Sequence, residues 1–228
     1  IKIANKRVGD NQPCFIIAEA GVNHNGDINL AKKLIDIAKE AGVDAVKFQT
    51  WITEDILTKN AEKVQYQKET KWDVGSLYDS IKKLELTHAD FKELFEYAKK
   101  KGIIFLSTPD DLKSVDFLVN LGVSAIKVGS AALTDTRLIK KVASYGLPII
   151  LSTGMSTIEE IKEAVDIIKK EVNDKLILLH CTSNYPVNLE DCNLRAMKTL
   201  RENFNVLAGY SDHTLDTITP VVAVALGA

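Results

Sequence analysis

Two lysines occupy nearly matching positions in the sequence, and each lies in a short apolar run. Lys47 stands in VKFQT and Lys127 stands in IKVGS. Burying an ammonium group is costly unless it faces an anion, so a lysine where a strand ends favours a bound phosphate or carboxylate. Two other interpretations stay open, which are a structural ion pair with Glu19 and a Schiff-base nucleophile of the kind that aldolases use.

Hydroxyl side chains recur at the ends of the apolar runs, at Thr108, Ser130, Ser152, Ser183 and Ser211. Gly129 and Gly154 accompany them, and backbone N–H groups at such helix entrances suit an anion. Each hydroxyl taken alone is explained as well by a helix cap. Taken together with the two lysines, the set predicts an anion-binding site.

Two histidines are candidate metal ligands. His213 lies in GYSDHT directly after Asp212, which we expect to orient the imidazole from behind. His180, in HCTSNYP, is explained more simply as a packed core residue. Its neighbour Cys181 is interpreted as an ordinary small buried residue, because no base partner for a nucleophilic thiol is visible.

The segment AEAGVNHNGD carries a further set of polar groups. Glu19 is a candidate for general acid–base work, because a carboxyl group after a strand can reach substrate. His24, with an asparagine on each side, is interpreted as a turn residue that touches substrate.

The elements that must position these residues alternate along the chain. Short runs that are apolar on successive residues predict strands buried on both faces, at 14–18, 45–48, 103–107, 125–128, 149–152, 176–180 and 206–209. Amphipathic stretches predict helices at 28–41, 88–101, 112–121, 134–145, 157–170, 194–202 and 217–226. Ser156 is the expected N-cap of the helix that contains Glu159. The alternation predicts parallel strands joined by right-handed crossovers.

Polar residues close nearly every strand, which favours a (β/α)₈ TIM barrel over an open sheet with one switch point. We expect one barrel domain over residues 1–228, with the eighth strand–helix unit missing from this chain. The polar and aromatic insert 50–87 is expected to form a partial lid over the active face.

Composition excludes several classes of protein. The chain has 228 residues, is 46% hydrophobic and carries a net charge of −2, which fits one sizeable core and argues against nucleic-acid and membrane-surface binding. Its longest apolar runs fall far short of the roughly 20 residues that span a bilayer. Three cysteines without CxxC spacing argue against a disulfide framework and a structural zinc site, so we expect a cytoplasmic protein.

Seven motifs in order carry a family resemblance, namely AEAGVNHNGD, VKFQT, FLSTP, IKVGS, ILSTGMS, LLHCTSNYP and GYSDHT. Over essentially the whole chain they resemble the sialic acid synthases of bacteria and archaea, the NeuB family. The resemblance implies an enzyme that condenses phosphoenolpyruvate with an N-acetylated hexosamine such as N-acetylmannosamine. The products would be a nine-carbon sialic acid-type 2-keto acid and phosphate. Legionaminic, pseudaminic and spore-coat sugar synthases share the phosphoenolpyruvate half, and a truncated, non-catalytic barrel is the remaining alternative.

The resemblance also assigns roles to residues. It implies that phosphoenolpyruvate is held by Lys47, Thr108, Lys127, Ser130, Ser152, Ser183 and Ser211, and that the sugar lies near Glu19, Gln49, Asn184 and Tyr185. His213 would bind Mn²⁺ or Mg²⁺. The resemblance implies a second metal-binding histidine and an antifreeze-like domain that completes a homodimer, and we expect both to be missing from this chain. Asp110 and Ala132 depart from the family pattern, which puts the choice of sugar in doubt.

Overall fold

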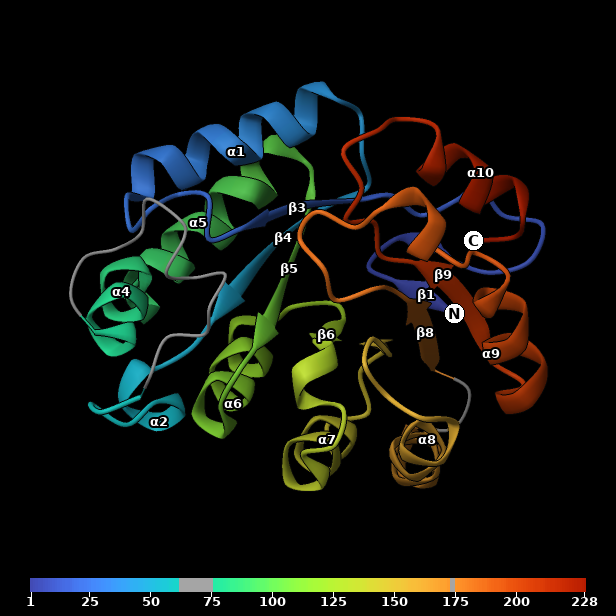
Figure 1. Ribbon diagram of the computed structural model, residues 1–228. Helices are drawn as coiled ribbons and strands as arrows, with labels where there is room; N and C mark the ends of the chain where they lie inside the picture. The colour runs from blue at the N-terminus through green and yellow to red at the C-terminus, as the bar shows by residue number, and fades with distance from the viewer. Residues whose placement is uncertain (62–75, 173–174) are drawn as a thin grey trace. The chain divides into compact units, whose positions relative to one another are not determined.

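The computed structural model describes residues 1–61, 76–172 and 175–228 (Figure 1). The chain forms two compact units. Residues 16–123 make the middle unit, and residues 1–15 together with 124–228 make the terminal unit. Each unit is built around a parallel β-sheet, which confirms the predicted α/β class.

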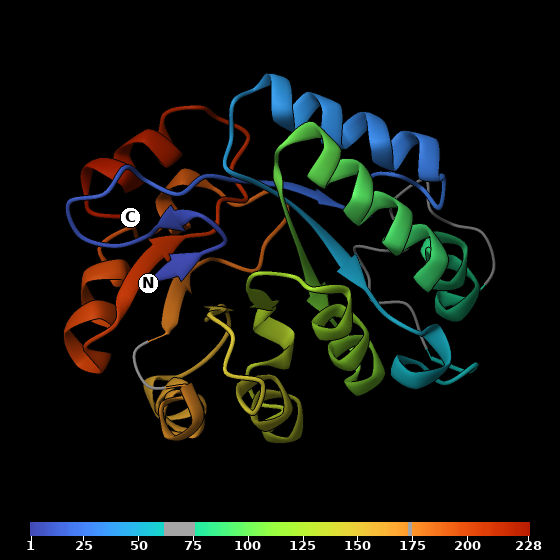
Figure 2. The ribbon, with the colours of Figure 1, turned by 180° about the vertical axis from the view of Figure 1, so that it is seen from behind.

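The sheet of the middle unit has the strand order β3 (Ile17–Gly21), β4 (Ala45–Thr50) and β5 (Ile104–Pro109). Three long helices accompany it, which are α1 (Ile28–Glu40), α5 (His88–Lys101) and α6 (Leu112–Leu121). Helices α1 and α5 lie side by side over the sheet, as both ribbon views show (Figures 1 and 2). Two shorter helices, α2 (Thr53–Ile56) and α4 (Leu77–Leu84), follow β4.

The two faces of this sheet differ in chemistry. Phe48 of β4 and Phe105 of β5 stack with ring centroids 5.5 Å apart, and Phe95 of α5 meets Phe105 edge-on at 5.8 Å. The face that carries these rings is therefore the face that α5 covers. Because side chains alternate along a strand, Lys47 and Gln49 lie on the opposite face. The face of β4 that carries Lys47 and Gln49 is therefore not the face that α5 covers.

The sheet of the terminal unit has the order β6 (Ile126–Val128), β7 (Ile149–Ser152), β8 (Leu176–His180) and β9 (Leu207–Tyr210). Its helices are α7 (Thr136–Ala143), α8 (Ile158–Val172), α9 (Ala196–Phe204) and α10 (Thr219–Ala225), with short 3₁₀ turns at Ser130–Ala132 and Leu189–Asp191. Helices α7 and α8 pack against each other (Figure 1). An antiparallel hairpin of β1 (Lys2–Ile3) and β2 (Lys6–Arg7) belongs to the same unit and was not predicted.

Helix boundaries follow local chemistry. Gly102 and Gly122 end α5 and α6 in the left-handed conformation, with φ of +69° and +94°, which a residue with a Cβ rarely adopts. The predicted N-cap of α8 is wrong by one residue. The Thr157 hydroxyl accepts the Glu160 N–H at 3.3 Å and the Glu160 carboxylate accepts the Thr157 N–H at 2.7 Å. Ser156 instead donates to the Gly154 carbonyl at 3.3 Å.

The predicted strands appear in the structure with small shifts, and only the first is placed wrongly. That strand begins at Ile17 rather than at Cys14, and residues up to Phe15 belong to the terminal unit. The Ile16 N–H donates to the Asp44 carboxylate at 2.8 Å instead of joining the sheet ladder. The eight-stranded barrel, its missing eighth unit and the single domain over 1–228 remain predictions.

Two further observations complete the fold. Residues 62–75 of the expected lid lie outside the described residues, so the lid also remains a prediction. Among the helices that the structure describes, none has the length and apolar character needed to cross a membrane.

Candidate functional site

Lys47 lies at the centre of a polar cluster in the middle unit. Its side chain is buried, and its Nζ lies 2.5 Å from Glu19 Oε2 and donates to Thr108 Oγ1 at 3.2 Å. The register of the sheet explains both contacts, because Glu19 lies directly opposite Lys47 and Thr108 lies two residues beyond its other partner, Leu106. We call Glu19, Lys47 and Thr108 the Lys47 cluster. The ion pair considered as an alternative for Lys47 is therefore present.

Glu19 faces solvent although its partner does not. Its side chain is 52% exposed against 9% for Lys47. The register shifts between Glu19 and Gly21, so the strand bulges after the carboxylate. Gly21 has φ of +49°, and a Cβ there would lie 3.2 Å from Glu19 Oε1. The bulge and the glycine leave the carboxylate accessible at the end of β3, where it can exchange protons with a ligand or with water.

Two more predicted residues lie in the middle unit. Gln49 is directly opposite Thr108 in the β4–β5 register and is half-buried. His24 lies in the turn after β3, as expected, but it is 1% exposed and its ring lies 6.0 Å from that of Phe48. Its Nδ1 accepts the Gly26 N–H at 3.1 Å, and burial lowers the pKa of the imidazole. His24 is therefore a neutral, packed turn residue.

Lys127 is positioned in the terminal unit by the same device. The side chain is buried, and Nζ donates to Ser152 Oγ at 2.7 Å and to the Val128 carbonyl at 2.8 Å. Lys127 lies opposite Ile150 in the β6–β7 register, so Ser152 again stands two residues beyond the cross-strand partner. A lysine and a hydroxyl at this offset share one face of a parallel sheet.

A second group in this unit surrounds Gly154, which follows β7. The Gly154 N–H donates to Ser130 Oγ at 3.0 Å, and Ser130 Oγ lies 3.2 Å from Cys181 Sγ. A Cβ at position 154 would lie 2.5 Å from Ser183 Oγ and 3.0 Å from both Cys181 Sγ and Ser130 Oγ. Only glycine fits there without displacing these groups. We call Ser130, Gly154, Cys181 and Ser183 the Gly154 cradle.

His213 presents the tautomer that a metal ligand needs. Its Nδ1 lies 2.7 Å from the Thr182 carbonyl, which accepts only a proton, so Nδ1 carries the hydrogen and Nε2 carries the lone pair. The Tyr185 ring lies 4.2 Å from the imidazole, centroid to centroid. The expected role of Asp212 is wrong, because the Nδ1 contact of His213 is with the Thr182 carbonyl, and the Asp212 carboxylate accepts the Thr214 N–H at 2.9 Å. The backbone carbonyl of Thr182 orients the ring instead.

The other predicted residues of this unit have simpler surroundings. His180 Nε2 lies 2.8 Å from the Cys192 carbonyl and its ring is 5.9 Å from that of Tyr210, which fits a packed residue rather than a metal ligand. Asn184 is exposed, and the adjacent Tyr185 is 71% exposed. Ser211 extends β9 through its N–H, which donates to the His180 carbonyl at 2.9 Å. Within the described residues no three histidine, cysteine or acidic side chains gather as a metal site.

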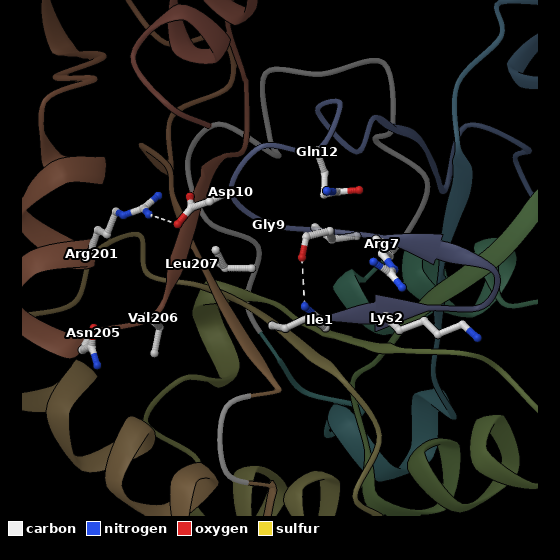
Figure 3. Close-up of a pocket in the computed structure, with 11 residues that line it drawn as sticks. Ile1, Lys2, Arg7, Gly9, Asp10, Gln12, Arg201, Asn205, Val206 and Leu207 are labelled. Carbon is white, nitrogen blue, oxygen red and sulfur yellow. Dashed lines mark hydrogen bonds and ion pairs between the residues drawn. The ribbon is translucent and has the colours of Figure 1, made fainter.

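The structure also contains a cavity of about 670 Å³ that the sequence did not predict (Figure 3). It lies between the β1–β2 hairpin and the start of β9, where Arg201 pairs with Asp10 at 2.5 Å. Ser211 and His213 follow the opposite, carboxyl end of β9. None of the predicted site residues lines this cavity, so it is distinct from the two clusters.

Cys181 is the cradle residue whose contact with Ser130 the sequence did not reveal. It is buried, as expected, but its thiol contacts a predicted anion ligand. The alternation of side chains along β8 could have indicated this contact. If β8 is continued by one residue, Cys181 falls on the face of Leu179, which lies opposite Ser152, while His180 falls on the other face.

Comparison with known proteins places the chain in a family. It is 50% identical to an uncharacterised protein of Methanocaldococcus jannaschii over 100% of this chain and 64% of that protein. It is 47% identical to the N,N'-diacetyllegionaminic acid synthase of Legionella pneumophila over 96% of this chain and 63% of that enzyme. The chain therefore spans less than two thirds of these relatives. The structure of a sialic acid synthetase from Leptospira borgpetersenii, in complex with citrate, matches with a TM-score of 0.89 at 39% identity, covering 100% of this chain and 75% of that one. The NeuB family model matches residues 34–228, and the chain belongs to the NeuB family.

Proposed function

We propose that this chain carries the phosphoenolpyruvate-binding half of a sugar-acid synthase. The enzyme would condense phosphoenolpyruvate with an N-acetylated hexosamine to give a nine-carbon sialic acid-type 2-keto acid and phosphate. The observation that carries the proposal is the buried ammonium group of Lys127, which donates to Ser152 in a unit that also holds the Gly154 cradle of a NeuB family member.

The terminal unit offers an anion several donors of complementary kinds. The Lys127 ammonium group supplies positive charge, and charge-assisted hydrogen bonds to phosphate or carboxylate oxygens are about twice as strong as neutral ones. The hydroxyls of Ser130 and Ser183 converge on Gly154, where the absent side chain leaves room. Phosphoenolpyruvate carries both a phosphate and a carboxylate, so it suits a site that combines a lysine with several hydroxyls. Ser211, which follows β9 in the same unit, is proposed to contribute to the same substrate.

The Lys47 cluster offers proton transfer in addition to charge. In the proposed reaction, C3 of phosphoenolpyruvate attacks the aldehyde of the open-chain sugar, and water then adds at C2. The tetrahedral intermediate collapses by cleavage of its C–O bond, and phosphate leaves. Glu19, accessible at the end of β3, would take the proton of the attacking water, and the lysines would offset negative charge throughout.

His213 would hold the proposed metal ion, Mn²⁺ or Mg²⁺. The imidazole fits this role because the Thr182 carbonyl fixes the hydrogen on Nδ1 and leaves the Nε2 lone pair for coordination. When bound, a divalent cation of this kind polarises an aldehyde oxygen. Gln49, Asn184 and Tyr185 would contact the sugar. We further propose that the whole protein acts in the cytoplasm as a homodimer.

The identity of the acceptor sugar is left open between members of one chemical class. The named relatives are synthases of a legionaminic acid derivative and of sialic acid. The proposed phosphoenolpyruvate-binding residues are equally compatible with a synthase of either product. A synthase for legionaminic, pseudaminic or spore-coat sugars is therefore the alternative to an N-acetylneuraminate synthase.

The test is phosphate release from phosphoenolpyruvate by the purified protein, with N-acetylmannosamine and with mono- and di-N-acetylated hexoses, with and without Mn²⁺. We expect release that depends on both a sugar and the metal ion. Protein that binds phosphoenolpyruvate but releases no phosphate with any sugar would support a binding module instead. Borohydride trapping of pyruvate on Lys127 would contradict the proposed role and favour a Schiff-base aldolase.

A further inference from the structure

The Ser130 hydroxyl occupies the centre of the Gly154 cradle and has contacts on two sides. Its Oγ accepts the Gly154 N–H at 3.0 Å and lies 3.2 Å from Cys181 Sγ. The geometry allows either the thiol or the hydroxyl to donate in the second contact. The direction of that one hydrogen bond decides what Ser130 offers to a ligand.

A serine hydroxyl has one proton and two acceptor positions. The Gly154 N–H already fills one acceptor position. If the Cys181 thiol donates, it fills the other position, and the Ser130 proton is left to point at a ligand. If Ser130 donates to sulfur instead, a lone pair is left for the ligand, and a lone pair repels an anion.

We propose that Cys181 is a positioning residue for the anion site, and that its S–H group donates to Ser130 Oγ so that the Ser130 proton is directed at the bound anion. The inference rests on the proposed function, which supplies the anion, and it adds to that function a role for a thiol. Cys181 does not touch the substrate in this account and acts only through Ser130.

Burial gives the thiol this influence. Cys181 is 6% exposed, so water has little access to take its place beside Ser130. The sulfur is also held close to Gly154, since a Cβ at position 154 would lie 3.0 Å from it. A thiol is a weak donor in water, but a donor without competition from solvent can still set the orientation of a neighbouring hydroxyl.

Replacing Cys181 by serine or by alanine distinguishes the effect of its hydrogen-bond donor from the effect of its volume, because serine keeps a donor and alanine does not. Binding of phosphoenolpyruvate and of inorganic phosphate is measured by calorimetry with the full chain. We expect Cys181→Ala to raise the dissociation constant of both anions by about five- to tenfold, because the Ser130 proton loses its fixed direction. Cys181→Ser keeps a donor and is expected to stay within about twofold of the unmodified chain. Cys192→Ala removes the other buried cysteine, whose Sγ lies 3.5 Å from the Asn188 carbonyl, and serves as the matched control.

The outcomes separate this inference from the proposed function. Equal binding by Cys181→Ala and the unmodified chain, or equal losses in the alanine and serine variants, would overturn the role of the thiol. Binding of phosphate without any condensation would count against the proposed reaction alone. The effect of the Cys181 variants on the dissociation constant of phosphate could still be measured. Failure of the unmodified chain to bind either anion would overturn both.

Infrared spectroscopy tests the direction of the hydrogen bond and does not depend on stability. With Cys14 and Cys192 both replaced by alanine, the remaining S–H stretching band belongs to Cys181. Addition of phosphoenolpyruvate or phosphate is expected to move this band to lower frequency as the thiol donates more strongly to Ser130. A band that lies at the frequency of a free thiol with the anion bound, or that moves to higher frequency, would show that the thiol does not donate and would overturn the inference.

Discussion

The two lysines lie inside β4 and β6 and are placed by one rule, but they have different neighbours. Each donates to a hydroxyl two residues beyond its partner on the next strand, Lys47 to Thr108 and Lys127 to Ser152. In the Lys47 cluster the ammonium group also pairs with the half-exposed carboxylate of Glu19. Lys127 lies instead in the unit that holds the hydroxyls and the backbone N–H of the Gly154 cradle.

The comparison indicates that the parallel register determines where each ammonium group lies. The residues at the neighbouring strand ends determine whether that group takes part in proton transfer or in anion binding. A carboxylate beside an ammonium group can accept and return a proton. Hydroxyls gathered at a glycine form hydrogen bonds with a ligand but do not act as a base as a carboxylate does. We therefore expect the Lys47 cluster to matter most for turnover and Lys127 to matter most for binding of phosphoenolpyruvate.

The largest expected effect comes from Glu19→Gln, which keeps the shape of the side chain and removes its capacity as a base. We expect kcat to fall by about a hundredfold while the KM for phosphoenolpyruvate changes by less than about threefold. Steady-state phosphate release measures both constants, and thermal unfolding controls for loss of the ion pair with Lys47. A raised KM with kcat unchanged would contradict this assignment, because it would show that the Lys47 cluster acts in substrate binding rather than in turnover.

His213→Ala is expected to remove the stimulation of turnover by Mn²⁺, because it deletes the proposed metal ligand, whose Nδ1 is held by the Thr182 carbonyl. Affinity for phosphoenolpyruvate should stay within about threefold, since Lys127 and the Gly154 cradle are untouched. Titration of the variant with Mn²⁺ in the phosphate-release assay checks the first point. A variant that Mn²⁺ still stimulates would show that the ligand assignment is wrong.

Lys127→Ala should weaken binding of phosphoenolpyruvate at least tenfold, which corresponds to about 1.4 kcal/mol. The buried amine would no longer meet the anion, and the hydroxyls alone cannot replace its charge. Calorimetry measures the dissociation constant, and Lys140→Ala, which removes an exposed lysine of α7, is the matched control. Unchanged affinity would remove Lys127 from the site.

Much of this fold could be predicted from the sequence, because strands buried on both faces must be apolar on successive residues. The run from Leu176 to His180 appears as a strand with the predicted bounds. The first strand was placed three residues early, because Cys14 is as apolar as a strand residue and pattern alone cannot detect that the chain passes between two units there. The β1–β2 hairpin, with two residues in each strand, is too short to leave a periodic signal.

The candidate site was predictable to the level of residue types but not of contacts. Lysines and hydroxyls at strand ends mark an anion site, and the structure joins Lys47 to Thr108 and Lys127 to Ser152. The orientation of His213 by the Thr182 carbonyl was missed, because every residue carries a carbonyl and its direction leaves no trace in the sequence.

The smallest expected effect concerns His24, which is buried in the middle unit, the unit that also holds Lys47. Burial lowers the pKa of the folded imidazole below its usual 6.5, so the unfolded chain binds more protons as the pH falls below that value. The contribution of His24 to stability is therefore full above pH 6.5 and declines below it. His24→Gln should make the free energy of unfolding depend less steeply on pH below about 6.5. Urea unfolding over this range measures the slope, and an unchanged slope would contradict the assignment.

The most direct test of the central claim is a crystal structure of the protein with phosphoenolpyruvate bound. The account predicts an oxygen of its phosphate or carboxylate within hydrogen-bonding distance of Lys127 Nζ, with Ser130 Oγ among the other donors. Phosphoenolpyruvate bound elsewhere, for example beside Arg201 in the cavity at the start of β9, with Lys127 left in its present contacts, would contradict it.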